Sequence, residues 1–214
     1  MERLLMAPFR RLVDAQKESR RSQFEALSPG PGGVLFLGDS ITEQGIWNEW
    51  FPEQKVLNRG VGGDTVSGVI DRLDSAINRP DVISLLIGTN DLGGSGISVR
   101  VSDIAAQMER LVTQIGALAP DALLLVNSVM PRKSGFADRV RALNRHYRNI
   151  ALNAGAEYVD LWPILADAQG GLRKDYSNDT LHLRGTGYQA WVEALKPFLA
   201  ELSPRFQSAR KVAT

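Results

Sequence analysis

The sequence has no cysteine and only two histidines, His146 and His182. The lack of cysteine excludes disulfide bonds, thiolate nucleophiles and cysteine-ligated metals, and two histidines are too few for a histidine-rich metal site. We therefore expect neither a metal nor a cofactor. No stretch reaches the roughly 18 apolar residues of a membrane span, and residues 1–11 lack the apolar run of a signal peptide. These absences predict a cytoplasmic protein without an integral membrane segment.

Charge of one sign is also lacking, since 25 basic and 24 acidic residues leave a net charge of +1. The charges are interspersed, so no nucleic-acid partner is indicated. The 214 residues are 43% hydrophobic, which is enough for one domain with a well-filled core. We find no internal repeat and no long linker. We expect a helix within residues 1–29, one α/β domain in residues 30–203 and a frayed tail in residues 204–214.

The first of these segments has the pattern of a basic amphipathic helix that begins near Pro8. Such a helix either lies on a membrane surface or packs on protein. Acidic Asp14, Glu18 and Glu25 interrupt its basic face, which favours packing on the domain or at a homodimer contact.

Five short apolar runs alternate with helical patterns along the rest of the chain. The runs are residues 33–37, 55–59, 81–87, 122–127 and 157–161. Continuous apolar strands that alternate with helices predict a parallel sheet covered by helices on both faces. The apolar spacing predicts single helices over residues 41–51 and 66–77, and a loop over residues 88–96.

A serine follows the first of these strands directly. Ser40 comes after the run that ends at Leu37, and a helical pattern begins immediately beyond it. Ligands bind at the carboxyl edge of open α/β sheets, and free N–H groups at a helix start suit a developing oxyanion. Ser40 is therefore a candidate nucleophile. The alternative is an ordinary turn in which Asp39 or Ser40 caps the helix.

Three later loops leave the same predicted edge, and together they supply the groups that acyl transfer needs. His182 suits a general base for Ser40, and Asp179, three residues earlier, suits the acceptor that orients the imidazole. The oxyanion donors would be the Ser40 N–H, the N–H of one glycine in residues 60–63, and the Asn90 amide. The edge therefore predicts an acyl-transfer site.

The other polar and aromatic residues near these loops have structural interpretations. We expect Asp39 to bond turn N–H groups, and Asp64 or Thr65 to cap the helix that begins at Val66. His146 lies in a helical pattern away from every strand end, which favours a structural histidine. We expect Trp47, Trp50 and Phe51 to pack in the core, with a wall of the substrate pocket as the alternative because they are close to Ser40. Asp91 either holds its loop or faces the site.

Four blocks carry a family resemblance, each following one expected strand or its equivalent. They are Gly38-Asp-Ser-Ile, Asn58-x-Gly-x-Gly-Gly-Asp-Thr65, Gly88-Thr-Asn-Asp91 and Asp179-x-x-His182. Together and in this order they resemble the SGNH hydrolases, also called GDSL esterases/lipases. The sequence is most similar to the branch that contains the platelet-activating-factor acetylhydrolase alpha subunits.

The resemblance implies a fold and a set of roles. The fold would be a three-layer α/β/α, flavodoxin-like domain with a five-stranded parallel sheet in the order 2-1-3-4-5. Ser40 would be the nucleophile and first oxyanion donor, with Gly63 and Asn90 as the second and third donors. His182 would be the base and Asp179 its partner. Only the resemblance singles out Gly63 among the glycines of its loop.

We therefore expect a serine esterase that acts on a small-molecule ester through an acyl-enzyme. Acetyl or other short acyl esters of small alcohols or carbohydrates are the expected substrates, because the chain has little room for a lipid-binding insertion. Two alternatives stay open: a lysophospholipase or thioesterase for longer acyl chains, and a non-catalytic module that binds carbohydrates or esters.

Overall fold

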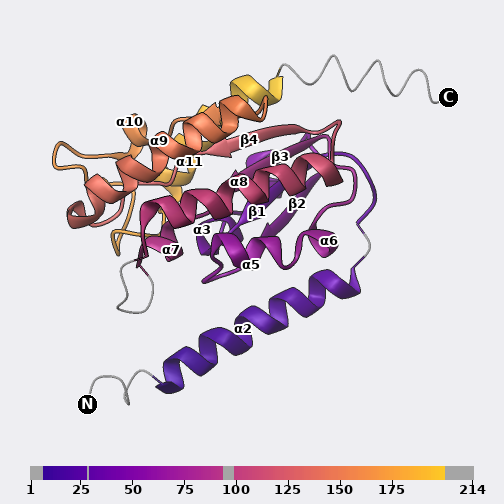
Figure 1. Ribbon diagram of the computed structural model, residues 1–214, viewed down its shortest axis with the longest axis horizontal. Coiled ribbons are helices and arrows are strands. Elements are labelled where there is room, and N and C mark those ends of the chain that lie inside the picture. Colours follow the sequence, from indigo (N-terminus) through magenta and orange to yellow (C-terminus); the bar gives the residue numbers. More distant parts are fainter. Residues whose placement is uncertain (1–6, 28, 94–98, 201–214) are drawn as a thin grey trace.

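Five parallel strands form the central layer of the computed structural model, which describes residues 7–27, 29–93 and 99–200. The order across the sheet is β2-β1-β3-β4-β5, as the family resemblance implies. Figure 1 shows the strands running side by side beneath long helices. The strands are β1 (Val34–Gly38), β2 (Val56–Gly60), β3 (Val82–Leu86), β4 (Leu123–Asn127) and β5 (Glu157–Val159).

The register of β1 with its two neighbours, β2 and β3, brings the carboxyl ends of these three strands to one edge. Gly38, the last residue of β1, pairs with Gly60 of β2 on one side and with Leu86 of β3 on the other. The loops that contain Ser40, Gly63 and Asn90 therefore leave the sheet next to one another. This register is what allows residues distant in sequence to form a single site.

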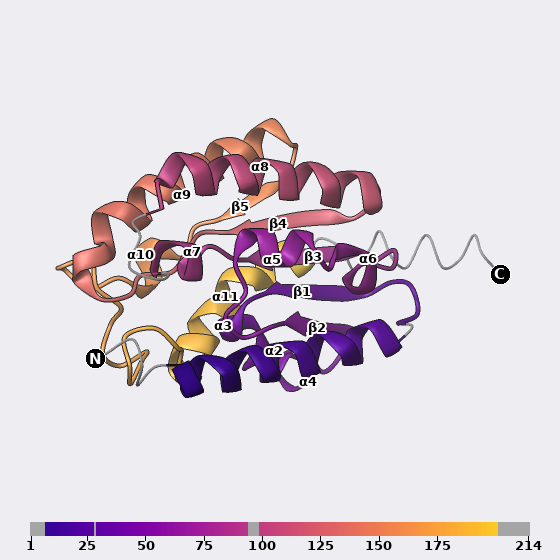
Figure 2. The same cartoon turned by 60° about the horizontal axis from the view of Figure 1, so that its bottom comes forward.

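Alternate residues of β1 enter two separate cores, as expected for a strand with helices on both faces. Leu35 and Leu37 face one core, whereas Val34 and Phe36 face the other. Figure 2 shows the sheet with the helices that pack against it. The first core is completed by α5 (Val66–Ile70), α6 (Leu73–Ala76), α8 (Val101–Leu118) and α9 (Ala137–Asn153). The second is completed by α3 (Ser40–Glu43), α4 (Trp47–Trp50), α10 (Trp162–Leu165) and α11 (Gly185–Ala200).

The single helix expected over residues 41–51 is wrong, since α3 and α4 are separate. The indole of Trp47 folds back over Gly45, where a Cβ would collide with it, and its Nε1–H donates to the Thr42 carbonyl at 2.8 Å. Trp47 is 1% exposed and stacks on Phe36 at a ring-centroid distance of 3.9 Å. Trp47 is therefore a core residue, as predicted, and its packing determines where the helix breaks.

The single helix expected over residues 66–77 is also wrong, because α5 ends at Ile70 and α6 begins at Leu73. Between them, the Arg72 side chain turns into the sheet edge, where Nη2 donates to the Gly38 carbonyl at 3.0 Å. The loop expected over residues 88–96 is partly helical: α7 covers Thr89–Gly93, and residues 94–98 lie outside the described residues. A short 3-10 turn, Ser134–Phe136, precedes α9.

Helix α2 (Ala7–Ala26) lies along the outside of the domain, next to β2 and α6 (Figures 1 and 2). Phe24 attaches it, with 4% of its surface exposed and the guanidinium of Arg59 stacked 4.5 Å from its ring centroid. The helix thus packs on the domain; a homodimer contact stays a prediction. The tail predicted at residues 204–214 lies outside the described residues.

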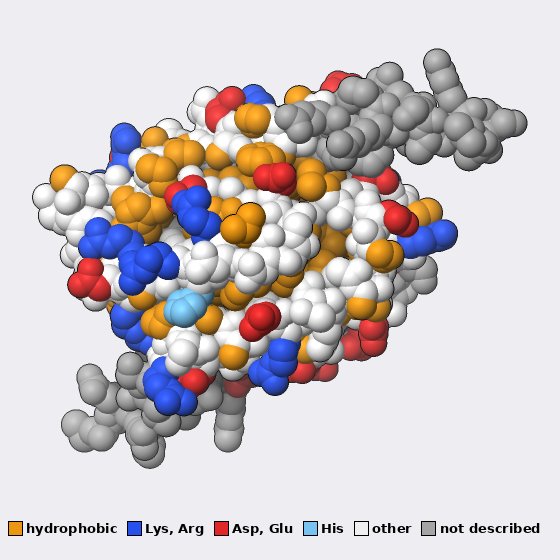
Figure 3. Space-filling model, turned by 45° about the horizontal axis from the view of Figure 1, so that its top comes forward, with side chains coloured by type: hydrophobic (Ala, Val, Ile, Leu, Met, Phe, Trp, Pro, Cys, Tyr) orange, Lys and Arg blue, Asp and Glu red, His pale blue; other side chains and the backbone are white. Residues whose placement is uncertain are grey.

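Within the described part of the chain, no helix is both long and apolar enough to cross a membrane. Figure 3 shows basic and acidic side chains on one face of the molecule, with apolar side chains between them. This mixture of charges accords with the interspersed charges of the sequence.

Candidate active site

Three predicted site residues form one hydrogen-bonded chain at the carboxyl edge of the sheet. Ser40 Oγ lies 3.0 Å from Nε2 of His182, although 142 residues separate them. The other ring nitrogen, Nδ1, lies 2.6 Å from Oδ2 of Asp179. A hydroxyl, an imidazole and a carboxylate connected in this order are the arrangement that activates a serine for nucleophilic attack.

The turn that holds Asp179 and His182 is tightly hydrogen-bonded. Asp179 Oδ1 accepts the backbone N–H groups of Leu181 at 2.9 Å and His182 at 2.8 Å, and the Ser177 hydroxyl at 3.2 Å. Burial disfavours the charged carboxylate, but the hydrogen bonds from His182 and Leu181 outweigh it and hold the pKa of Asp179 well below its usual value. Asp179 is therefore an anion at neutral pH and can orient the imidazole.

Asp39 caps the helix that begins with Ser40, as predicted. Its Oδ1 accepts the N–H of Ile41 at 3.0 Å, while Oδ2 has no hydrogen-bond partner among the described residues. Burial, with smaller contributions from the charges of Asp64 and Asp91, raises the pKa of Asp39 to about 7. This cap orients the turn that presents Ser40 to His182.

The glycine loop, residues 60–63 at the end of β2, contains three candidate oxyanion donors, and two of their N–H groups are already occupied. Gly60 donates its N–H to Asn58 Oδ1 at 2.9 Å, and Gly62 donates to Glu43 Oε2 at 2.6 Å. Gly63 is exposed and has a positive φ of 75°, a conformation that glycine adopts readily. No hydrogen bond from the Gly63 N–H to a described residue is present. Side-chain acceptors therefore distinguish Gly63 from its neighbours, which the sequence motif alone does not do.

Asn90, on α7, is anchored to the same loop. Its Nδ2 donates to the Asp64 carbonyl at 2.8 Å, which uses one of the two N–H groups of the amide. The next residue, Asp91, accepts the backbone N–H of Val66 through its carboxylate, with Oδ2 at 3.1 Å. Asp91, whose role the sequence left open, thus connects the third loop to the second.

Of the two helix caps that the sequence predicted, Asp64 is not the one used. Thr65 caps α5 instead, because its side chain accepts the N–H of Gly68 at 3.2 Å. The buried Asp64 carboxylate is surrounded by cations: Oδ2 lies 2.7 Å from Arg72 Nε, and Oδ1 lies 2.8 Å from Arg21 Nη2. Sequence reasoning missed these ion pairs, and the only local signal was an acidic residue inside a glycine-rich turn.

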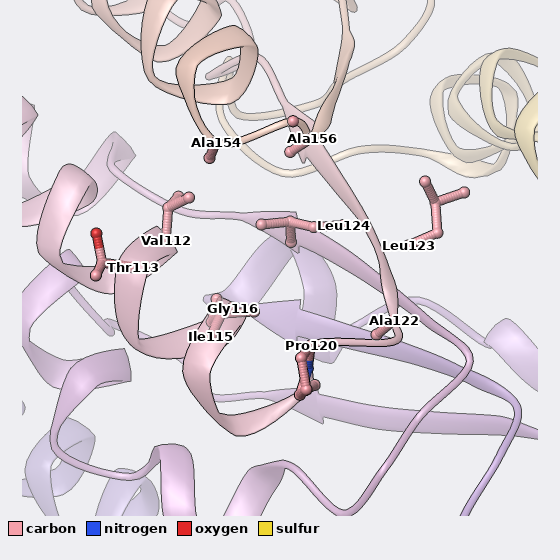
Figure 4. Close-up of a pocket in the computed structure, with 12 residues that line it drawn as sticks. Val112, Thr113, Ile115, Gly116, Pro120, Ala122, Leu123, Leu124, Ala154 and Ala156 are labelled. Atoms are coloured by element: carbon pink, nitrogen blue, oxygen red, sulfur yellow. The ribbon is translucent and has the colours of Figure 1, made fainter.

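His146 is exposed on α9, as predicted, and is not part of the site. A pocket of about 370 Å³ also lies away from the site. Figure 4 shows its mostly aliphatic lining, including Ile115, Pro120 and Ala154, at the amino end of β4. That is the edge of the sheet opposite to Ser40. Across the residues that the structure describes, no group of three or more His, Cys, Asp or Glu is placed to hold a metal ion.

A family model described as GDSL-like Lipase/Acylhydrolase matches residues 36–190. The chain belongs to this family. The match begins within β1 and ends within α11, so it includes the loops that carry Ser40, Asn90 and His182. Members hydrolyse ester bonds, and this GDSL-like acylhydrolase is accordingly a hydrolase of that class.

Individual relatives agree with the family assignment. The acylhydrolase is 28% identical over 181 residues to platelet-activating factor acetylhydrolase IB subunit alpha1 of Rattus norvegicus, covering 79% of this chain and 75% of the relative. A solved structure from Streptococcus pneumonia, whose description names a platelet activating factor, has a TM-score of 0.83 at 26% identity. The match covers 92% of this chain and 98% of that one. An acetyl xylan esterase from Geobacillus stearothermophilus has a TM-score of 0.62 at 21% identity, covers 81% and 96%, and supports the fold alone.

Proposed function

We propose that this acylhydrolase is a serine esterase in which Ser40 is the nucleophile, His182 the general base and Asp179 its orienting partner. The observation that carries the proposal is the continuous chain of short contacts, 3.0 Å from Ser40 Oγ to Nε2 and 2.6 Å from Nδ1 to Asp179 Oδ2. A serine hydroxyl is a weak nucleophile until a base within hydrogen-bond distance takes its proton.

In the first half-reaction, Ser40 Oγ attacks the ester carbonyl carbon while its proton passes to His182 Nε2. The Asp179 carboxylate stabilises the imidazolium that results. The carbonyl oxygen becomes an oxyanion, which accepts hydrogen bonds from the N–H groups of Ser40 and Gly63 and from the Asn90 amide. When the intermediate collapses, the ester C–O bond breaks and His182 returns the proton to the leaving alcohol.

The second half-reaction repeats these steps with water. His182 takes a proton from a water molecule as its oxygen attacks the acyl carbon. The new tetrahedral intermediate uses the same three donors, and its collapse breaks the bond to Ser40 Oγ. The carboxylic acid leaves and the serine recovers its proton, so each cycle consumes one ester and one water.

We propose acetyl and other short acyl esters as the substrates. The rat relative is an acetylhydrolase subunit by name, and the described chain has no additional subdomain that would enclose a long acyl chain. A lysophospholipase or thioesterase is the second candidate. A purely binding module is disfavoured, since binding alone does not require a serine in contact with a base and an acid.

The proposal is tested with p-nitrophenyl esters of C2 to C16 acids and with acetylated sugars. We expect Ser40→Ala and His182→Ala each to abolish hydrolysis while leaving the circular dichroism spectrum unchanged. His146→Ala, the matched control at the other histidine, should retain wild-type rates. Full activity in Ser40→Ala would disprove the nucleophile assignment, and peak activity at C8 or longer would replace the short-chain proposal by the second candidate.

A further inference from the structure

Helix α2 precedes the segment that matches the family, yet its side chains reach the proposed oxyanion hole. Lys17 Nζ lies 2.7 Å from Asp64 Oδ1 and 3.5 Å from the Gly63 carbonyl oxygen. Arg21 Nη2 lies 2.8 Å from the same Asp64 oxygen. Val13 is also close, because a Cβ added to Gly63 would lie 3.7 Å from its Cγ1. One face of α2 is therefore in contact with the loop that presents the Gly63 N–H.

A second connection runs through Arg20. Its Nε donates to the Gly60 carbonyl at 3.2 Å and lies 3.3 Å from Oε1 of Glu43. The other Glu43 oxygen accepts the N–H of Gly62 at 2.6 Å. Glu43 belongs to α3, the helix that begins at Ser40. Arg20 thus links α2 to Gly60 directly and, through Glu43, to Gly62 and to the helix of the nucleophile.

Asp64 is the point where these contacts affect catalytic geometry. Its side chain has no exposed surface. Arg72 pairs with Oδ2, and within the described part of the chain the cations that pair with Oδ1 are the two from α2. A buried carboxylate oxygen that loses its partners is costly, and the loop would shift to expose it to water. Any such shift moves two proposed donors together, because Gly63 precedes Asp64 in the chain and Asn90 donates to the Asp64 carbonyl at 2.8 Å.

We propose that Lys17, Arg20 and Arg21 are positioning residues that hold the oxyanion hole in its working geometry from outside the matched family segment. The inference rests on the proposed function, since it assigns these cations to the Gly63 and Asn90 donors of that site. None of the three contacts the reacting atoms in this arrangement. They act through Asp64 and Glu43, which carry the glycine loop.

The positioning role predicts a specific effect on kcat and KM. The oxyanion exists only in the transition state and the tetrahedral intermediates, so displaced donors lower kcat and leave KM nearly unchanged. Misplacement by about 1 Å costs on the order of 100-fold in rate. We expect the Lys17→Met/Arg21→Met double variant to lose about 10- to 100-fold in kcat on p-nitrophenyl acetate, with KM within about twofold. The single variant Arg21→Lys keeps the positive charge at this position, so it should retain most of the wild-type kcat.

Two matched controls remove charge without touching Asp64. Arg110→Met removes one exposed cation from α8, and Glu18→Ala changes an exposed residue of α2 itself. Both should keep the wild-type kcat. Binding of phenylboronic acid supplies a readout that a loss of folded protein does not mimic. Ser40 Oγ adds to boron, its proton passes to His182, and the tetrahedral anion that forms needs the same donors.

We expect the dissociation constant for phenylboronic acid to rise in the double variant by a factor similar to the fall in kcat, with rates expressed per folded site from active-site titration. Unchanged kcat per folded site, or a lower kcat with unchanged boronate affinity, would overturn the positioning role. If the wild-type protein hydrolyses none of the C2 to C16 esters and none of the acetylated sugars, the proposed function itself fails, and the inference fails with it. Wild-type activity together with an unaffected double variant overturns the inference alone.

Discussion

Asp39 gives the most direct test of how the site turn is built. The residue is 1% exposed, and among the residues that the structure describes only one of its carboxylate oxygens has a partner, the N–H of Ile41. Burial, reinforced by the charges of Asp64 and Asp91, raises the pKa of Asp39 from 3.8 to about 7. Asp39→Asn keeps an oxygen for the Ile41 N–H and removes the titration.

The sign of the effect follows from proton linkage. Because the pKa is higher in the folded state, the folded protein binds the proton more tightly than the unfolded chain between about pH 4 and pH 7. The wild type therefore loses stability as the pH rises through this range and loses no more above it. A shift of one pKa unit corresponds to about 1.4 kcal/mol, so the whole effect is about 4 kcal/mol. Between about pH 5 and pH 8 it amounts to about 3 kcal/mol.

Urea unfolding of both proteins at pH 5 and pH 8, followed by circular dichroism, measures this difference. We expect the free energy of unfolding of Asp39→Asn, relative to wild type, to improve by about 3 kcal/mol from the lower to the higher pH. For a chain of this size, that is about 6–12 °C in Tm. Asp138→Asn removes a carboxylate whose side chain is 96% exposed and should show no such change. An equal stability difference at both pH values would refute the reasoning.

Three further substitutions probe the site loop and the helices. Asn90→Ala should lower kcat on p-nitrophenyl acetate by about 10²- to 10³-fold, and steady-state kinetics would contradict the donor role if only KM changed. Gly60→Ala should unfold the chain or lower its Tm sharply, because the new Cβ would collide with the backbone of Glu43; a wild-type Tm would show that the two segments are not packed this closely. Gly116→Ala should raise the free energy of unfolding by about 0.5–1 kcal/mol, since the site on α8 is open to 4 Å; a lower urea midpoint would contradict this.

The strands could be predicted closely, but two of the helices could not. Apolar runs located all five strands, because a strand buried on both faces is apolar throughout. Residues 66–77 have a regular helical period, yet the chain breaks before Leu73 so that Arg72 can reach Asp64 and the Gly38 carbonyl. A contact made across the fold outweighed the local preference for one helix. The break at Gly45 has the same kind of cause, the indole of Trp47.

In the candidate site, too, contacts within a short segment could be predicted from the sequence, whereas contacts across the fold could not. The spacing of Asp179 and His182 was informative because their contact is made within a single turn. Ser40 could be assigned to the same edge because parallel strands share the direction of their carboxyl ends. Gly63 could not be chosen in this way. The structure distinguishes it because side-chain oxygens of Asn58 and Glu43 accept the N–H groups of the other two glycines.

By itself, therefore, the sequence determined the class of fold, the order of the strands along the chain and the residues that meet at the carboxyl edge of the sheet. Those features depend on local patterns and on motifs only a few residues long. Only the tertiary structure decided which N–H groups are free and which cations hold the loop that presents them. Arg21 and Asp64 are 43 residues apart, and no periodicity or spacing connects them, because their contact exists only when α2 packs against the folded domain.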